Sequence, residues 1–94
     1  MFLSLFLAIL GVAQMETPNL YKSLNIANSI KHRAKQRGIM LKTMLSDLSL
    51  GSNTMSNLRH YRMIAADSLA RIADYLDCSV DYLLGRTDNP EVNR

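Results

Sequence analysis

A short stretch between residues 52 and 62 concentrates the side chains of this sequence that suit recognition by hydrogen bonding. Asn53 and Asn57 carry amides that offer donors and an acceptor in one plane, and Ser52 and Ser56 add hydroxyls. Such an amide pairs with N6 and N7 of adenine through two hydrogen bonds, worth about 1–3 kcal/mol of discrimination. The alternative is that these side chains are solvated or cap a helix. The residue types therefore suggest base reading.

Basic side chains flank the amides. Arg59 and Arg62 follow them and Lys42 precedes them, and such residues bind phosphate or sugar, which positions a protein on DNA without reading its sequence. Ordinary surface charge is the alternative. From Lys22 to Arg62 there are eight basic residues and one acidic residue, a balance of +7, whereas from Met63 onward there are three basic and six acidic residues, a balance of −3. One half of the chain therefore suits a polyanionic partner.

The sequence contains no set of residues typical of an enzyme or a metal site. Paired carboxylates, a nucleophile with its base and a phosphate-binding glycine loop are all missing. His32 and His60 have no cysteine or carboxylate at ligand spacing, and Cys78 is the single cysteine, which we expect to pack as a small apolar residue. We therefore expect a non-enzymatic protein with no catalytic residue, metal or cofactor, and no small-molecule ligand.

The amides lie on the second of two short predicted helices. The first covers residues 41–48, because its apolar residues recur at i, i+3, i+4 and i+7. The second covers residues 52–59 and keeps Met55 and Leu58 on one face, away from the polar side chains. Two helices joined by a tight turn form a helix-turn-helix, which presents the outer face of its second helix to the DNA major groove.

Three further helices are predicted, over residues 24–37, 66–76 and 80–84. No segment alternates between apolar and polar residues with a period of two, so we expect an all-α fold with five helices. The predicted inner stripes of the two longer helices are Ile26, Ala27, Ile30 and Ala34, and Leu69, Ile72, Ala73 and Leu76.

The helix ends differ in their capping residues. Ser79 is a suitable cap for the last helix, and Ser23 or Asn25 for the first. Met40 precedes the second helix and offers no cap, at a cost of about 1 kcal/mol. In the turn of the helix-turn-helix, Gly51 is available for an unusual backbone angle.

The first fourteen residues, MFLSLFLAILGVAQ, contain no charged side chain. As a signal peptide they lack a basic n-region, and as a membrane helix they fall short of the roughly 20 apolar residues needed. Another interpretation is that translation begins at Met15 and that these residues are not part of the protein. The remaining interpretation is that these residues form a hydrophobic arm that folds onto the domain or onto a partner. We expect no membrane partner.

Residues 68–91 read SLARIADYLDCSVDYLLGRTDNPE. With Ile30, Gly38 and the motif over residues 41–58, this sequence resembles the lambda-repressor and Cro-like helix-turn-helix regulators, the xenobiotic-response-element (XRE) family, over residues 24–91. The resemblance implies a compact five-helix domain of the lambda-repressor type. It also implies that the protein binds double-stranded DNA as a homodimer, at a palindromic operator near its own promoter.

The resemblance also implies roles for individual residues. The base contacts that it implies are Ser52, Asn53, Ser56 and Asn57. The implied phosphate contacts are Thr54, Arg59, Tyr61 and Arg62, to which we add Lys42 for its charge.

The sequence departs from the family at three positions. Leu41 stands where members usually start the helix with a glutamine that touches phosphate. Leu45 and Ser49 stand where alanine and glycine are common. One expected phosphate contact is therefore missing, and the angle between the two helices of the motif is in question.

These observations lead to a division of the chain and a function. We predict an N-terminal extension over residues 1–23, a DNA-binding domain over residues 24–86 and a polar, mobile tail over residues 87–94. The helix at 80–84 has more large apolar residues than it can bury, so we expect a dimer contact from Tyr82, Leu83 and Leu84, with core packing as the alternative. We predict a cytoplasmic transcriptional repressor; the alternative is an interaction module such as an antitoxin or anti-repressor.

Overall fold

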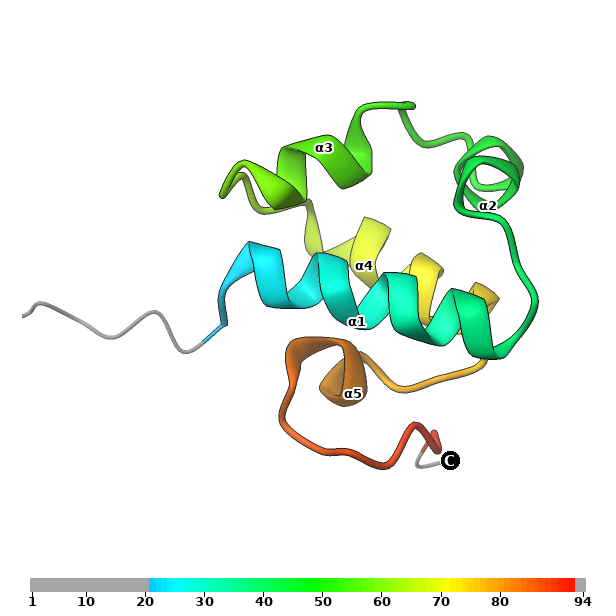
Figure 1. Ribbon diagram of the computed structural model, residues 1–94, viewed down its shortest axis with the longest axis vertical. Helices are drawn as coiled ribbons and strands as arrows, with labels where there is room; N and C mark the ends of the chain where they lie inside the picture. The colour runs from blue at the N-terminus through cyan, green and yellow to red at the C-terminus, as the bar shows by residue number, and fades with distance from the viewer. Residues whose placement is uncertain (1–20, 93–94) are drawn as a thin grey trace, which may run out of the picture.

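The computed structural model describes residues 21–92, so the interpretations of residues 1–14 lie outside the described part. It contains the helices α1 (Ser23–Gln36), α2 (Leu41–Asp47), α3 (Thr54–Arg59), α4 (Ala66–Tyr75) and α5 (Val80–Leu84), shown in Figure 1. Residues 21–92 include no strand. The predicted all-α architecture with five helices is confirmed; α5 has the predicted bounds, and no end of the other helices differs from its prediction by more than two residues.

Helix α1 is the centre of the domain. It packs against α3 on one side and against α5 on the other, and α4 packs against α5 (Figure 1). Ile26 and Ile30 of α1 are both 0% exposed, because they face neighbours in both directions. This arrangement holds α3 on the side of the molecule opposite to α5.

The predicted apolar stripes meet in one core. All eight stripe residues of α1 and α4 are buried, and Met44, Leu45, Met55 and Leu58 of the helix-turn-helix join them. Burial of each large aliphatic side chain contributes roughly 1.5–3 kcal/mol to folding. The helix-turn-helix is thus anchored on the core through one face of each of its helices.

The helix ends follow the predictions in two of three cases. Ser79 caps α5 by accepting a hydrogen bond of 3.0 Å from a backbone N–H three residues later, and Met40 gives α2 no side-chain cap. The predicted cap of α1 is wrong. Ser23 is the first helical residue and is 6% exposed, and Lys22 at the cap position makes no side-chain hydrogen bond to the helix.

An arginine joins α1 to the end of α4. Arg33 donates from Nε to the carbonyl of Leu76 at 3.0 Å and from Nη2 to the carbonyl of Asp77 at 2.8 Å. The last carbonyls of a helix have no partner within the helix, so the guanidinium satisfies groups that otherwise need water. The two helices are thereby held at a fixed relative position.

The turn of the helix-turn-helix contains a residue in the left-handed region. Ser49 has φ of 57°, and the N–H of Leu50 donates back to the carbonyl of Leu45 at 2.8 Å. The prediction that Gly51 takes the unusual angle is wrong, because the positive φ lies two residues earlier. Glycine adopts this region at no steric cost, which agrees with the expectation from the resemblance that glycine is common at this position.

The chain after α5 folds back on the domain. Residues 86–92 form two side-chain-stabilised turns, in which Thr87 Oγ1 and Asn89 Oδ1 each accept from a backbone N–H two residues later. The N–H of Ser79 donates to the carbonyl of Pro90 at 2.9 Å. This segment is thus packed against the domain and does not form the separate polar tail that we predicted after residue 86.

Candidate DNA interface

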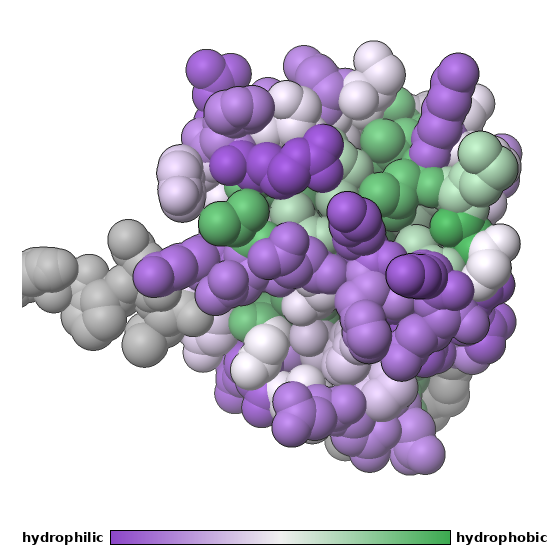
Figure 2. Space-filling view, viewed as in Figure 1, coloured by the Kyte–Doolittle hydropathy of each residue, from purple (hydrophilic) through white to green (hydrophobic). Residues whose placement is uncertain are grey.

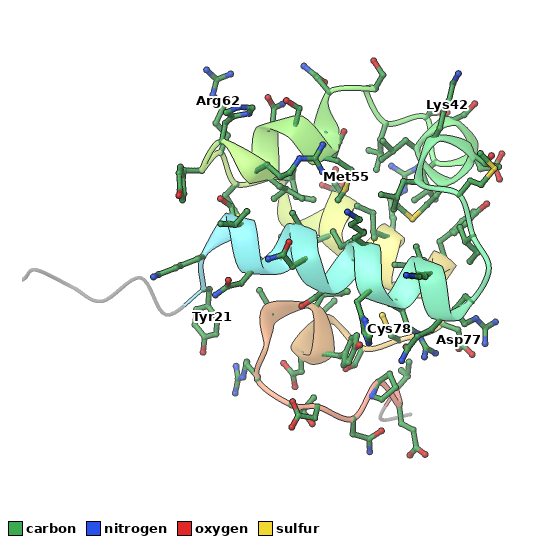
Figure 3. All side chains as sticks on the ribbon, viewed as in Figure 1. Tyr21, Lys42, Met55, Arg62, Asp77 and Cys78 are labelled. Carbon is green, nitrogen blue, oxygen red and sulfur yellow. The ribbon has the colours of Figure 1, made fainter. Side chains whose placement is uncertain are left out.

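Helix α3 has two faces of different character. Met55 and Leu58 are 5% and 0% exposed and pack toward α1, as Figure 3 shows for Met55. The four predicted base-contact residues share the other side: Ser52 and Asn53 are exposed in the preceding turn, and Ser56 and Asn57 are half-buried on the helix. The apolar face fixes the helix, and the polar face remains available to a ligand.

The helix begins two residues later than predicted, and Thr54 stabilises its start. Thr54 is 8% exposed, and its Oγ1 donates to the carbonyl of Gly51 at 2.7 Å. Its backbone N–H donates to the same carbonyl at 3.1 Å. Both of its donors therefore have a partner inside the protein, so Thr54 is a poorer phosphate contact than the resemblance implies.

The amide of Asn53 is exposed next to this turn. Asn53 occupies the cap position of α3, but its side chain makes no capping hydrogen bond. A Cβ added at Gly51 would lie 2.8 Å from Asn53 Oδ1, so the glycine leaves room for the amide. Asn53 is thus an exposed residue whose amide oxygen lies beside Gly51.

The hydroxyl of Ser56 has a neighbour within the helix. His60 Nδ1 lies 2.7 Å from the carbonyl oxygen of Ser56 and 3.3 Å from its Oγ. Because a carbonyl only accepts, the 2.7 Å contact requires Nδ1 to carry the hydrogen. His60 therefore ends the helix by binding its last turn, and Nε2 is directed away from that contact.

The basic residues stand at both ends of this face. Lys42, Arg59 and Arg62 are exposed, and Figure 3 shows Lys42 and Arg62 extending outward from opposite ends of the side formed by α2 and α3. The N–H of Arg62 donates to the carbonyl of Asn57 at 2.9 Å, which fixes the loop after α3. Tyr61 in that loop is 74% exposed with φ of 65°.

Acidic side chains are absent from the middle of this face. The sequence contains no Asp or Glu between Asp47 and Asp67. Asp47, at the end of α2, accepts a hydrogen bond from the hydroxyl of Tyr75 on α4. This hydrogen bond, with some burial and the carboxylate charge, raises the pKa of Tyr75. The single acidic residue of the helix-turn-helix is thus directed toward the body of the protein.

A comparison with known proteins accounts for this arrangement. A family model described as the Cro/C1-type HTH DNA-binding domain matches residues 29–89, which include all five helices in part or whole. The chain belongs to this family. In a Cro/C1-type domain the second helix of the motif is the one that enters the DNA major groove, and here that helix is α3.

One curated relative supports the Cro/C1-type assignment. The chain is 28% identical over 71 residues to the HTH-type transcriptional regulator ImmR of Bacillus subtilis (strain 168). The similarity covers 74% of this chain and 56% of ImmR, so the chain spans just over half of that relative's length. No solved structure matches the chain significantly.

Between α2 and α3 this Cro/C1-type domain has a groove that the sequence did not predict. Its volume is about 580 Å³, its floor is formed by Leu41, Leu45, Leu50 and Met55, and Lys42 and Arg59 stand at its rim. Figure 2 shows hydrophobic surface in this region, surrounded by hydrophilic residues. The signal in the sequence was Leu45, which lines the groove and stands where the resemblance led us to expect a small residue.

The predicted dimer residues of α5 do not share one environment. Leu83 is 0% exposed inside the protomer, which favours the alternative of core packing for this residue. Tyr82 and Leu84 are half-buried and keep part of their surface exposed. Cys78, 1% exposed beside this helix, packs as a small apolar residue as predicted, and its burial raises the pKa of its thiol.

Metal and membrane chemistry find no support in the described residues. Over residues 21–92, no group of three or more histidine, cysteine or acidic side chains could hold a metal ion. In the same range, no helix has the length and apolarity to cross a membrane. The candidate site is thus the polar and basic face of α3 with its neighbours.

Proposed function

We propose that the protein is a sequence-specific transcriptional regulator, most simply a repressor, that inserts α3 and the turn before it into the major groove of double-stranded DNA. The observation that supports it is the polar side of α3 and of the turn before it, where two exposed and two half-buried amide or hydroxyl side chains lie between basic side chains in a domain of the Cro/C1 type. The name of the relative ImmR, a transcriptional regulator, supports the same function.

In this proposal different residues supply sequence choice and affinity. Asn53 and Asn57 read adenine through paired hydrogen bonds, and Ser52 and Ser56 add weaker base contacts. Lys42, Arg59 and Arg62 bind phosphate, with Tyr61 beside them, and this binding releases counterions whatever the base sequence. We retain Thr54 only as a support of the turn.

The proposed protein acts in the cytoplasm as a homodimer on a palindromic operator. Two copies related by a twofold axis place their α3 helices in successive major grooves, about 34 Å apart. Tyr82 and Leu84 remain candidates for the contact between the copies, because both keep exposed apolar surface. Binding at its own promoter would block transcription there.

The test is a selection from random double-stranded DNA with the purified 94-residue chain at two salt concentrations. Enrichment of a palindrome whose halves are one helical turn apart is the expected result. Binding that depends on salt but enriches no sequence would contradict the proposed reading by Asn53 and Asn57. If no DNA binds, the proposal fails, and a search for a protein partner, as for an antitoxin or anti-repressor, replaces it.

A further inference from the structure

The groove between α2 and α3 is an apolar surface without a cover among residues 21–92. Leu45 and Met55 form its base, and Leu41 and Leu50 are only half-buried although their side chains are fully apolar. A contiguous apolar hollow with a polar rim on a small protein is typical of an interaction site. Its rim includes Arg59, so the hollow opens on the same face as the proposed DNA contacts.

We propose that the apolar segment of residues 1–13 of the same chain docks in this groove and competes there with DNA. The segment reads MFLSLFLAILGVA and contains one polar side chain, Ser4, and no charge. Its apolar side chains match the apolar floor of the groove. It has no acidic side chain, so we expect it to bind the floor and not the basic residues at the rim. This is the arm interpretation of the N-terminal sequence, with a specific place to bind.

The length of the connecting chain allows this docking. Tyr21, the first described residue, shares a hollow at the start of α1 with Tyr61 and Met63. Tyr61 follows Arg59, which lines the groove, by two residues, and the six residues of α3 extend only about 9 Å. Residues 14–20 can span about 23 Å when extended, which is more than twice the length of α3.

Attachment to the same chain favours this occupant over a second copy. A connection of only seven residues gives the segment an effective concentration of about 1 mM at the groove, well above the concentration of free chains in a dilute solution. The docked segment would cover Arg59 and Lys42 at the rim, and so reduce DNA affinity. Only this last consequence rests on the proposed function; the docking itself does not.

The test of docking uses the full chain with the variant Phe6→Trp. The natural sequence has no tryptophan, so the indole is the sole reporter. We expect blue-shifted emission and weak quenching by acrylamide at low protein concentration. In this background Leu41→Glu, which places a carboxylate on the groove floor, should expose the indole and increase quenching to that of a free peptide.

Two variants control the result. Met40→Glu adds the same charge one residue earlier, at a side chain that is 69% exposed and does not line the groove, and should leave the indole protected. Leu7→Glu changes the segment itself and none of the residues matched by the family model, and it should expose the indole as Leu41→Glu does. Circular dichroism checks that each variant keeps its helices.

The outcomes separate docking from function. If the indole is quenched equally in the parent and in Leu41→Glu, or if its protection rises with protein concentration, intramolecular docking is overturned. If docking behaves as expected and no variant binds DNA, the proposed function fails and the docking stands. If both hold, a segment docked about nine-tenths of the time weakens DNA binding about tenfold, so Leu7→Glu should bind DNA about tenfold more tightly.

Discussion

Asn57 and Arg62 lie close together, and the proposal gives them different roles. The Arg62 N–H donates to the Asn57 carbonyl, so the two side chains extend from one fixed segment. Asn57→Ala should relax the base preference at one position of each half-site, with a loss of about 1–3 kcal/mol for the preferred base only. Arg62→Ala should weaken binding to all sequences and reduce the slope of log affinity against log salt by about 1.

Both effects are measured by titrating each variant with the selected operator at several salt concentrations. The same titrations with single-base variants of the operator give the base preference. A uniform loss in the two variants would contradict the division between base and phosphate contacts.

Arg33 and Arg37 provide a matched pair for stability. Arg33 binds two main-chain carbonyls at the end of α4, whereas Arg37 makes an exposed ion pair of 3.6 Å with Asp77. We expect Arg33→Ala to lower the free energy of unfolding by about 2 kcal/mol, because two charged hydrogen bonds to main-chain carbonyls are lost. Arg37→Ala should lower it by less than about 1 kcal/mol. Urea denaturation of both variants measures the difference, and equal losses would refute the assignment.

The buried thiol of Cys78 makes stability depend on alkaline pH. Burial raises the pKa of this thiol in the folded state, and the nearby Arg33 guanidinium offsets part of that effect. A raised pKa means that the fold favours the protonated thiol, so its contribution is full below the unfolded pKa, about 9, and is lost as pH rises through the folded value. Stability should therefore fall above about pH 9.

Cys78→Ala isolates this effect, because the other groups that titrate at high pH are the same in both proteins. Urea denaturation at pH 8 and pH 10 should show a smaller decrease for the variant than for the natural chain. A decrease of the same size in both would show that the thiol makes no contribution.

Among the elements, the turn between α2 and α3 contains a correctable strain. Ser49 has φ of 57°, a conformation that costs an L-residue about 1–2 kcal/mol relative to its right-handed alternative. Ser49→Gly removes that cost but adds freedom to the unfolded chain, so we expect a net gain of about 0.5–1 kcal/mol. The control is Ser46→Gly, at an exposed position inside α2, which should lose about 1 kcal/mol. Thermal denaturation of both variants measures the changes in stability. A loss of stability in both would contradict the assignment of strain to Ser49.

The elements were largely predictable because their signals are local. The apolar spacing located all five helices, and Ser79 identified the start of α5. Gly51 was misleading, because a glycine marks conformational freedom without showing which residue needs it. Ser23 was also misleading, because a serine before an apolar stripe can be the first buried residue of a helix as well as its cap.

The groove was not predictable in this way. It depends on the distance between α2 and α3, which is set by how each helix packs on the rest of the core. Residues far apart in sequence determine that packing, so the large side chain at Leu45 indicated only that the family geometry was in question.

At the scale of the whole molecule, charge is divided between two sides. The basic residues of the motif lie with α2 and α3, whereas Asp81, Asp88 and Glu91 follow from α5 onward, on the opposite side of α1. Screening at physiological salt acts over about 8 Å, so each side retains its own local field. If the proposed function holds, we expect this division to orient the protein toward DNA before any contact forms.

The segment after α5 is part of the folded domain, and its removal should show this. A chain that ends at Gly85 loses the hydrogen bond from Ser79 N–H to Pro90 and the packing of residues 86–92. We expect a loss of about 1–2 kcal/mol in the free energy of unfolding. A chain that ends at Val92 is the control and should keep its stability in urea denaturation. Equal stability of the two chains would show that the segment contributes nothing.

The two faces of α3 also bear on how such a protein changes over generations. Stability depends on Met55 and Leu58, whereas the four candidate base readers contribute little to the core. Substitutions among those four positions therefore have small effects on folding, so mutation can explore new target sites at nearly constant stability. A lineage of such DNA-binding domains can diverge in the DNA sequences that it recognises while the scaffold stays the same.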